Sequence, residues 1–259
     1  MRMKTTVIKG LVNVELKNPI LVEGFPGLGM VGSIATKYLV KQLKARKLAI
    51  LHSPHFPYHV VVDKKGSARL LRGEFYFWKN ENGVNDFIFL TGDSQSQTIE
   101  GQFEVANSIL DFAEKKNVKT VITIGGYRNE VEGTPTVVAV ATNSVLLEKA
   151  LSAKAVSSEA GTPIVGTAGL LLGLAKFRKM EAVCLLGETR GYLPDPNTAK
   201  TVIEILQRFL GITIELSGLD KQIERSKEIL GKMQDIEKRR VKYMQKMRRV
   251  EEERITYIS

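Results

Sequence analysis

The residues with the most chemical potential form a glycine-rich segment near the start of the chain. We expect a short strand over residues 20–22, a turn over 24–29 and a helix that begins near Met30. Residues 27–32 have the G-x-G-x-x-G spacing of dinucleotide-binding turns, in which a helix amino terminus holds a pyrophosphate. The candidate ligand-binding or structural residues of this turn are Gly24, Gly27, Gly29 and Gly32.

Several observations weigh against a bound dinucleotide. An acidic residue that holds the ribose is expected about 20 residues further on, and residues 48–53 contain none. Pro26 lies within the turn and has no N–H to offer to an anion. The G-x-x-x-x-G-K-[ST] pattern of a nucleotide P-loop is absent from the sequence. We therefore favour a structural role, in which the glycines allow tight packing and positive φ at the strand-to-helix crossing.

The other reactive side chains do not form a recognisable catalytic or metal-binding set. His52, His55 and His59 are separated by prolines that prevent a regular helix from aligning them, and a fourth ligand would have to come from elsewhere. Cys184 lies in an apolar run and is expected to be a buried, inert core residue. No G-x-S-x-G nucleophile motif occurs. We predict no metal, no cofactor and no catalytic residues.

Glu188 and Arg190 are the remaining candidates, because they follow the predicted strand 182–186. Open α/β sheets bind their ligands at the carboxyl ends of the strands. The two side chains are therefore candidate ligand-binding residues. We favour the alternative that they pair with each other and hold the loop.

The order of apolar segments predicts an α/β fold, a three-layer sandwich with a mainly parallel central sheet. The predicted strands cover residues 20–22, 47–51, 118–124, 136–141 and 182–186, and a β-hairpin is inserted over 68–78 and 86–91. The predicted helices cover residues 30–45, 96–116, 144–151, 166–177 and 197–210.

The last forty residues differ from the rest, because they are highly charged and contain no proline and one glycine. We predict two parts, an α/β core over residues 1–218 and a helical extension over 219–259. Apolar residues recur every seventh position of the extension, as in an imperfect coiled-coil seam. These are Ile229, Ile236, Tyr243, Val250 and Tyr257.

Composition favours a soluble cytoplasmic protein. The hydrophobic content of 43% is that of a globular domain, and one cysteine suits a reducing compartment. No signal peptide or membrane-spanning segment is recognisable. The net charge of +10 could attract nucleic acid or acidic proteins, but without a nucleic-acid-binding motif we favour a solvated, mildly cationic surface and do not expect nucleic acid.

Five short motifs occur in a characteristic order. They are E-G-F-P-G-L-G-M-V-G at 23–32, S-P-H-F-P at 53–57, L-T-G-D at 90–93, I-G-G at 124–126, and L-G-E-T-R-G-Y at 186–192 with D-P at 195–196. Together they resemble the PAC2 family, the proteasome assembly chaperone 2 proteins and their archaeal homologues. The resemblance covers about residues 5–235. It implies a core similar to that of nucleoside phosphorylases, with a chaperone or scaffold role in place of catalysis.

The resemblance also implies homo-oligomers with projecting carboxyl-terminal helices. In some relatives these helices end in a hydrophobic-tyrosine-any tripeptide that inserts into pockets of the proteasome α-ring. Here Ile258 occupies the penultimate position where the tyrosine belongs, and Tyr257 precedes it. We expect Ile255, Tyr257 and Ile258 to form an apolar anchor for a partner.

We therefore predict a non-enzymatic proteasome assembly chaperone homologue or adaptor. It is expected to be a homo-oligomer that engages protein partners through its carboxyl-terminal helix, with proteasome α-subunits or a homologous subunit as candidate partners. The alternative is a nucleotide- or small-ligand-binding enzyme, resembling ATP-grasp ligases, that uses the turn from Gly24 to Gly32.

Overall fold

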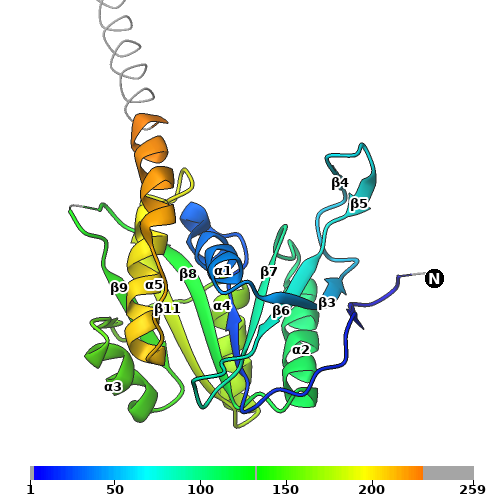
Figure 1. Ribbon diagram of the computed structural model, residues 1–259, viewed down its shortest axis with the longest axis horizontal. Coiled ribbons are helices and arrows are strands. Elements are labelled where there is room, and N and C mark those ends of the chain that lie inside the picture. Colours follow the sequence, from blue (N-terminus) through cyan, green and yellow to red (C-terminus); the bar gives the residue numbers. More distant parts are fainter. Residues whose placement is uncertain (1–2, 132, 230–259) are drawn as a thin grey trace, which may run out of the picture. The chain divides into compact units, whose positions relative to one another are not determined.

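The computed structural model describes residues 3–131 and 133–229 (Figure 1). The chain divides into two compact units, Met1–Leu216 and Ser217–Ser259. In the second unit, the described residues 217–229 are helical. The predicted anchor residues Ile255, Tyr257 and Ile258, and the heptad positions after Ile229, lie outside the described residues.

The first unit is built on a mixed nine-stranded sheet, counted over the described residues. From one edge to the other its strands are β1 (Val7–Gly10), β3 (Arg46–His52), β6 (Gly73–Trp78), β7 (Phe87–Gly92), β2 (Ile20–Glu23), β8 (Thr120–Arg128), β11 (Glu181–Thr189), β9 (Val137–Ala141) and β10 (Val156–Ser157). The four central strands, β7, β2, β8 and β11, are parallel. Their sequences are apolar runs because both faces are covered.

The flanks of the sheet are largely antiparallel, so the sheet is mixed and not mainly parallel as predicted. β1, β3, β6 and β7 pair antiparallel in succession, and β9 is antiparallel to β11. The hairpin formed by β6 and β7 explains part of the antiparallel pairing. A parallel crossover needs about a dozen residues or more, and the loop 79–86 between β6 and β7 is shorter.

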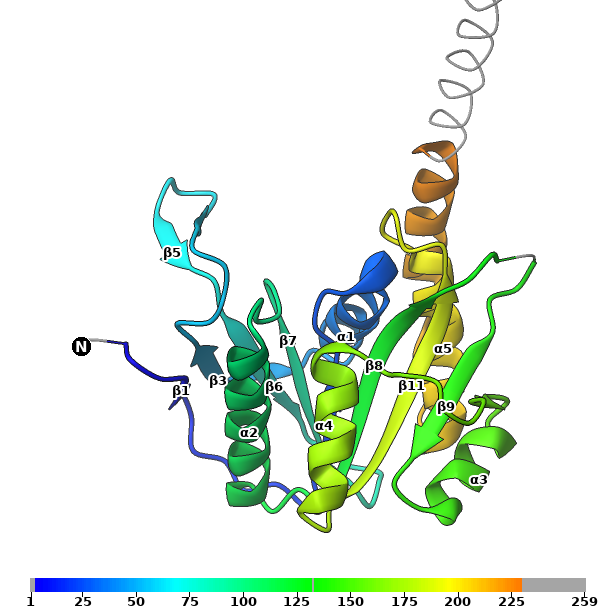
Figure 2. The same cartoon turned by 180° about the vertical axis from the view of Figure 1, so that it is seen from behind.

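Five helices cover the two faces of the sheet in the described residues. α1 (Val31–Gln42) and α5 (Pro196–Leu210) lie on one face, and α3 (Ser144–Ser152) packs on β9 and α5 (Figure 1). α2 (Ile99–Lys115) and α4 (Gly166–Phe177) lie side by side on the other face (Figure 2). The α/β architecture with helices on both faces of a large sheet is therefore confirmed.

The predicted hairpin strand 68–78 is divided in the structure. Ala68–Leu70 forms β5, which leaves the main sheet and pairs with β4 (Val60–Val62), while β6 begins at Gly73. The alternation changes phase between the adjacent residues Leu70 and Leu71, and the strand divides at this point. The β4–β5 arm is held to the end of β7 because Arg69 binds the carboxylate of Asp93 through two nitrogens, at 2.6 and 3.0 Å.

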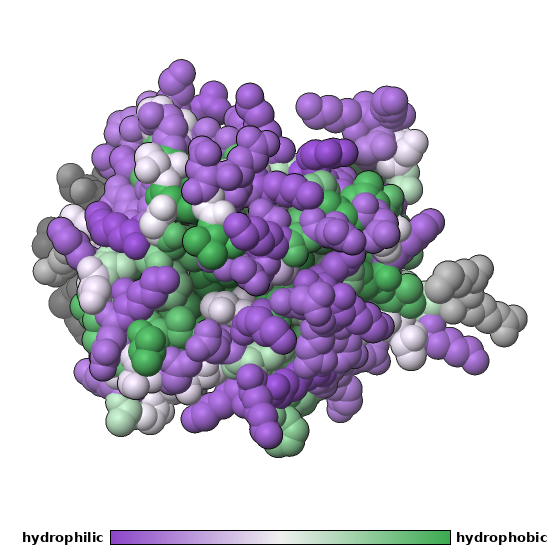
Figure 3. Space-filling model, turned by 60° about the horizontal axis from the view of Figure 1, so that its bottom comes forward, coloured by the Kyte–Doolittle hydropathy of each residue, from purple (hydrophilic) through white to green (hydrophobic). Residues whose placement is uncertain are grey.

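Alternation along the central strands builds a core on each face. Leu21, Val121 and Ala182 occupy one register row and face α2 and α4. The next row turns Val22 and Ile122 towards α1, and all five side chains are buried. The surface seen from below is mainly hydrophilic, with hydrophobic residues showing between the polar ones (Figure 3). Within the described part of the chain, no helix combines the length and apolarity needed to cross a membrane.

Candidate functional site

The carboxyl ends of the parallel strands meet at one edge of the sheet, which is where α/β sheets bind ligands. The loops after β2, β7, β8 and β11 bring together the glycine turn, Gln95, Tyr127 and the residues from Glu188 to Asp195. Both predicted site segments that fall within the described residues therefore lie at this edge.

The glycine turn contains a short 3-10 segment, η1 (Leu28–Met30), before α1. Gly29 has a φ of 58°, a conformation that glycine adopts at little cost. A Cβ at Gly29 would lie 2.5 Å from the Thr189 hydroxyl oxygen. The Gly29 carbonyl accepts a hydrogen bond from the Asp195 N–H at 2.8 Å. The middle of the turn is thus packed against the end of β11 and the start of α5.

Two other turn glycines lie against backbone atoms. A Cβ at Gly24 would collide with the Gly32 carbonyl oxygen, and a Cβ at Gly32 would collide with the carbonyl oxygen of Ile124 on β8. Gly27 differs, because a Cβ there would meet Gln95 at 3.4 Å, close to ordinary contact. Three of the four glycines are therefore required by close packing within the protein.

Gln95 joins the turn to α4. Its amide nitrogen donates to the Pro26 carbonyl at 2.8 Å, and its carbonyl oxygen accepts from the Thr167 N–H at 2.9 Å and from the Thr167 hydroxyl at 3.0 Å. This contact occupies an N–H group in the first turn of α4, which would otherwise be open to an anion. Sequence analysis missed Gln95 because no local pattern marks it.

Asp195 has a similar role at α5. One carboxylate oxygen accepts from the Thr198 N–H at 2.9 Å and caps the helix. The other accepts from the hydroxyls of Thr189 and Thr198, at 2.8 and 2.9 Å. The D-P pair before a helical segment is a recognisable cap signal, but its link to β11 is visible only in the fold.

Glu188 and Arg190 have different partners and do not hold the loop through a bond to each other. The buried Glu188 carboxylate accepts from the Asn129 side chain at 2.7 Å and from the Thr136 N–H at 2.9 Å. Arg190 lies beyond the end of β11 and faces the exposed Glu130 at 3.8 Å. Because Arg190 no longer follows the alternation of the strand, the two side chains diverge.

Glu23 is a further candidate that sequence analysis did not single out. It ends β2, is 1% exposed, and accepts a hydrogen bond from the Phe25 N–H at 2.9 Å through one carboxylate oxygen. The other oxygen has no hydrogen-bond partner among the described residues. Burial raises the pKa of Glu23 to about 8, although the Phe25 hydrogen bond lowers it, so the carboxyl is mainly neutral at pH 7.

Cys184 lies two strands from Glu23 in the same register row, with Thr123 of β8 between them. It is fully buried, as predicted. Burial raises the pKa of the Cys184 thiol to about 12, so it remains protonated. This thiol is therefore not a nucleophile in the folded protein.

None of the hydrogen bonds described above for the glycine turn involves a histidine. His55 Nε2 is 3.2 Å from a Glu104 carboxylate oxygen, and the other oxygen accepts from the Thr6 N–H at 2.5 Å. These contacts fasten the N-terminal segment to α2. Across residues 3–131 and 133–229, no three His, Cys, Asp or Glu side chains are grouped as metal ligands.

An exposed aromatic surface lies next to the turn. The Arg128 guanidinium stands 4.4 Å from the centroid of the Tyr192 ring, and Leu28 packs beside Gly191. Leu28 and Tyr192 are both exposed. A surface with an aromatic ring, an arginine and an aliphatic side chain is typical of protein interfaces.

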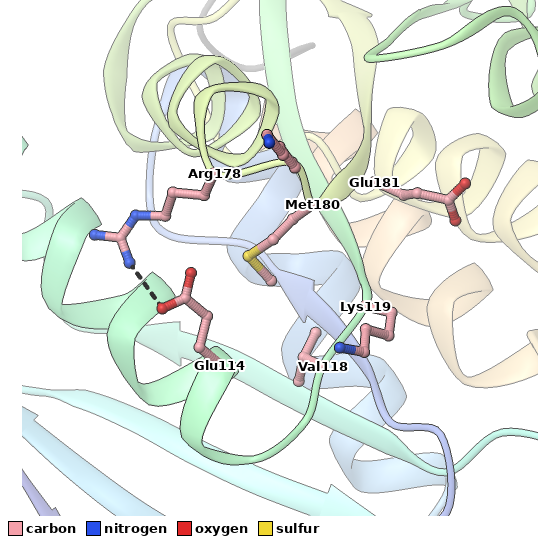
Figure 4. A pocket seen from close by; sticks show the side chains of 7 residues that line it. Glu114, Val118, Lys119, Arg178, Met180 and Glu181 are labelled. Atoms are coloured by element: carbon pink, nitrogen blue, oxygen red, sulfur yellow. Dashed lines mark ion pairs between the residues drawn. The ribbon is translucent and has the colours of Figure 1, made fainter.

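A pocket of about 330 Å³ lies at the opposite end of β8 and β11 (Figure 4). It is lined by Glu114, Val118, Lys119, Arg178, Lys179, Met180 and Glu181. Arg178 forms ion pairs with Glu114 at 3.4 Å and with Asp111 at 2.6 Å. Its charge is therefore neutralised by carboxylates of α2. The pocket is remote from the carboxyl edge of the sheet.

Comparison with known proteins places these features in a family. The sequence profile of the PAC2 family matches residues 21–234. A protein of Methanocaldococcus jannaschii is 31% identical over 235 residues, which cover 89% of this chain and 88% of the relative.

Solved structures agree with this assignment. The structure of PbaB from Pyrococcus furiosus, an archaeal proteasome activator, is 38% identical, has a TM-score of 0.86, and matches over 90% of this chain and 100% of that chain. PbaA from Pyrococcus furiosus, an archaeal homologue of proteasome-assembly chaperone, is 28% identical with a TM-score of 0.74, over 94% of this chain and 98% of that chain. The chain therefore belongs to the PAC2 family.

Proposed function

We propose that this protein is a non-enzymatic homologue of proteasome assembly chaperones and activators. It forms homo-oligomers in the cytoplasm and engages protein partners through its carboxyl-terminal helix, with the proteasome α-ring as the first candidate. The observation that carries this proposal is the similarity to PbaB along 100% of that chain, at a TM-score of 0.86.

The geometry of the carboxyl edge supports a scaffold role. Gly29 and Gly32 are packed on protein atoms, and the carboxylates of Glu188 and Asp195 accept hydrogen bonds from neighbouring segments. These groups hold the loops in place. The exposed Tyr192 beside them suits contact with another protein.

The carboxyl-terminal segment supplies the means of contact in this proposal. Residues 220–259 contain 12 Lys or Arg and 8 Asp or Glu, so they are attracted to acidic surfaces. Several copies of a weak apolar anchor on one oligomer raise the local anchor concentration and give avidity. Ile255, Tyr257 and Ile258 are the proposed anchor residues.

Co-sedimentation with an archaeal 20S proteasome tests the proposal. The full-length protein is compared with a variant in which Ile255, Tyr257 and Ile258 are replaced by serine, and with Val84→Ser, an exposed residue of the β6–β7 loop, as the control. We expect the anchor variant to lose binding and Val84→Ser to retain it. Equal recovery of all three proteins would refute the role of the anchor.

A nucleotide- or small-ligand-binding activity is the second candidate, and one observation favours it. Glu23 is a buried carboxyl with a strongly raised pKa and an unpaired oxygen, at the strand end that precedes the glycine turn. Perturbed carboxyls cluster at functional sites. Titration calorimetry with ATP, ADP and phosphate tests this idea, and binding lost in Glu23→Gln would favour it. Gly29→Val is less suitable, because it disturbs packing on Thr189.

A further inference from the structure

The outer surface of α4 is unusual because the helix carries no charged residue before Lys176, close to its end. Residues 160–175 contain no Asp, Glu, Lys or Arg. Val165, just before the helix, is 81% exposed, and Phe177 at its end is 87% exposed. By contrast, α1 exposes Lys37 and Lys41. A solvent-facing helix is normally polar on its outer side, so this face of α4 is suited to a partner.

α2 extends the apolar surface beside α4. Ile99 is 76% exposed, and Phe103 lies one turn further on and is also exposed. Phe103 is followed at the same helical spacing by Asn107 and Asp111, both of which bind Arg178 at the end of α4. Ile99 and Phe103 therefore share a stripe of α2 with the residues that bind Arg178. The two helices run side by side (Figure 2). We call these exposed residues of the two helices the α2/α4 face.

We propose that the α2/α4 face binds the same face of a second copy of this chain, with the two α4 helices antiparallel about a twofold axis. This inference rests on the homo-oligomer in the proposed function and names the surface that forms it. A contiguous exposed apolar patch marks an interaction site. The pattern of side chains and charges identifies a second copy as the occupant.

The pattern along α4 is self-complementary. Gly169, Gly173 and Phe177 follow one another at four-residue spacing and share a stripe of α4, and the exposed Val165 immediately precedes the helix. An antiparallel twofold centred near residue 171 places Phe177 opposite Val165 of the second copy, and Gly173 opposite Gly169. The position of a Cβ at Gly173 has no atom within 4 Å, so the stripe is open there, whereas a Cβ at Gly169 would meet the backbone of Ile164, which covers the stripe at that position. An isologous contact requires such matching of a surface with itself.

The charges around the face are complementary in the same orientation. α2 and α4 start at the same end, because Thr167 donates to Gln102 there, and they finish together where Arg178 binds Asp111. At the starting end Glu100 is exposed, and at the finishing end Lys176 and Lys179 are exposed. Antiparallel pairing brings the acidic end of one copy to the basic end of the other, whereas parallel pairing would oppose like charges.

The area of the α2/α4 face is compatible with a protein–protein interface of standard size. The twelve residues of α4 span about 18 Å, and two neighbouring helices are together about 20 Å wide. The two helices together cover roughly 360 Å² in projection, within the ~800 Å² that each partner buries in a standard interface. The charged rim supplies the remainder, as in most interfaces.

Sedimentation equilibrium of the full-length chain tests the face. We expect Phe177→Glu to raise the dissociation constant of the pair at least about tenfold, because it would place a charge against Val165 of the second copy. Val145→Glu on α3 is the matched control, since Val145 is another exposed apolar residue of a helix, and it should leave the mass unchanged. Lys176→Glu should weaken the pair, and the double variant Lys176→Glu with Glu100→Lys should restore it.

Cross-linking tests the antiparallel orientation directly. Val165→Cys and Phe177→Cys combined in one chain should give a covalent dimer on mild oxidation, and either substitution alone should give little. Within one chain the two positions are about 18 Å apart, well beyond the ~7 Å limit for a disulfide. The native Cys184 is buried and does not compete.

The outcomes separate this inference from the proposed function. An oligomeric wild type whose mass and cross-linking are unaffected by the Phe177 substitutions would overturn the α2/α4 face alone. A wild type that is monomeric at all concentrations would overturn both the face and the homo-oligomer. Dissociation by Val62→Glu in the β4–β5 arm, with Phe177→Glu still oligomeric, would assign the contact to the arm and refute our proposal.

Discussion

Replacement of Glu23 by glutamine should make the protein more stable at alkaline pH. The Glu23 carboxyl is 1% exposed, and one of its oxygens has no partner among the described residues. Glutamine has nearly the same shape and keeps an oxygen to accept the hydrogen bond from the Phe25 N–H. The substitution therefore removes the ionisable proton while it preserves the shape of the buried side chain.

The magnitude follows from the raised pKa. In the unfolded chain Glu23 titrates near its ordinary value of 4.5, and in the folded protein near 8. Between these values the unfolded chain has lost a proton that the folded protein retains, so the unfolding free energy falls as pH rises. One pH unit corresponds to about 1.4 kcal/mol, and the full window costs the wild type about 3–5 kcal/mol. Below about pH 4.5 the carboxyl is protonated in both states, so this loss of stability is absent.

Urea unfolding followed by circular dichroism measures this difference. Wild type and Glu23→Gln are compared at one protein concentration at about pH 5, 7 and 9. Within the window, the difference in unfolding free energy should change by ~1.4 kcal/mol per pH unit. The unfolding free energy of the variant, relative to that of wild type, should rise steadily with pH up to about pH 8. Glu130→Gln, in an exposed loop, is the control and should show no such trend. A constant difference between Glu23→Gln and wild type at all three pH values would refute the reasoning.

Three further predictions concern the contacts around the same edge. Gly29→Ala should lower the unfolding free energy by about 1–3 kcal/mol, measured by urea unfolding, because it combines a left-handed φ with a clash against Thr189. Asp195→Ala should cost about 1–2 kcal/mol in the same assay through loss of the α5 cap. Hydrogen bonds from Arg69 and a backbone N–H outweigh burial and lower the pKa of Asp93, so this carboxylate stabilises the fold above its unfolded pKa. Arg69→Ala should accelerate proteolysis of the β4–β5 arm at neutral pH, and acidification through the Asp93 pKa should do the same in wild type.

Local pattern predicted the elements whose sequence signal is strong. The β-branched run that forms β8 and the apolar run that forms β11 became neighbouring central strands. Asn143 introduces a helix with the cap expected from its side chain, whereas α5 is capped by Asp195, two residues before the predicted helix start at 197. Pattern failed where partners are distant in sequence. Arg69 of the β4–β5 arm binds Asp93, twenty-four residues later, and no periodicity reports this contact.

In the candidate site, too, local pattern predicted some features, whereas others depend on residues distant in sequence. The loop after β11 was predicted to lie at the ligand-binding edge because open α/β sheets bind their ligands at the carboxyl ends of the strands. The significance of Glu23 was not visible, since a carboxylate at a strand end is usually solvated and its burial here depends on the packed fold. The divergence of Glu188 and Arg190 likewise depends on where β11 ends and on Asn129, nearly sixty residues earlier.

The glycine turn shows why its spacing alone does not identify a ligand. A dinucleotide-binding turn needs glycines for a tight bend and for close approach of the helix to the sheet, in addition to its contact with phosphate. Here Gly29 supplies the bend, and Gly32 lies against the backbone of Ile124. Any strand that passes at once into a closely packed helix imposes these requirements. The ligand-specific part of the pattern is the set of free N–H groups and the ribose carboxylate, and residues 48–53 lack that carboxylate. The spacing thus reports the geometry of the crossing, and evidence for a ligand has to come from groups outside the motif, of which Glu23 is the one to test.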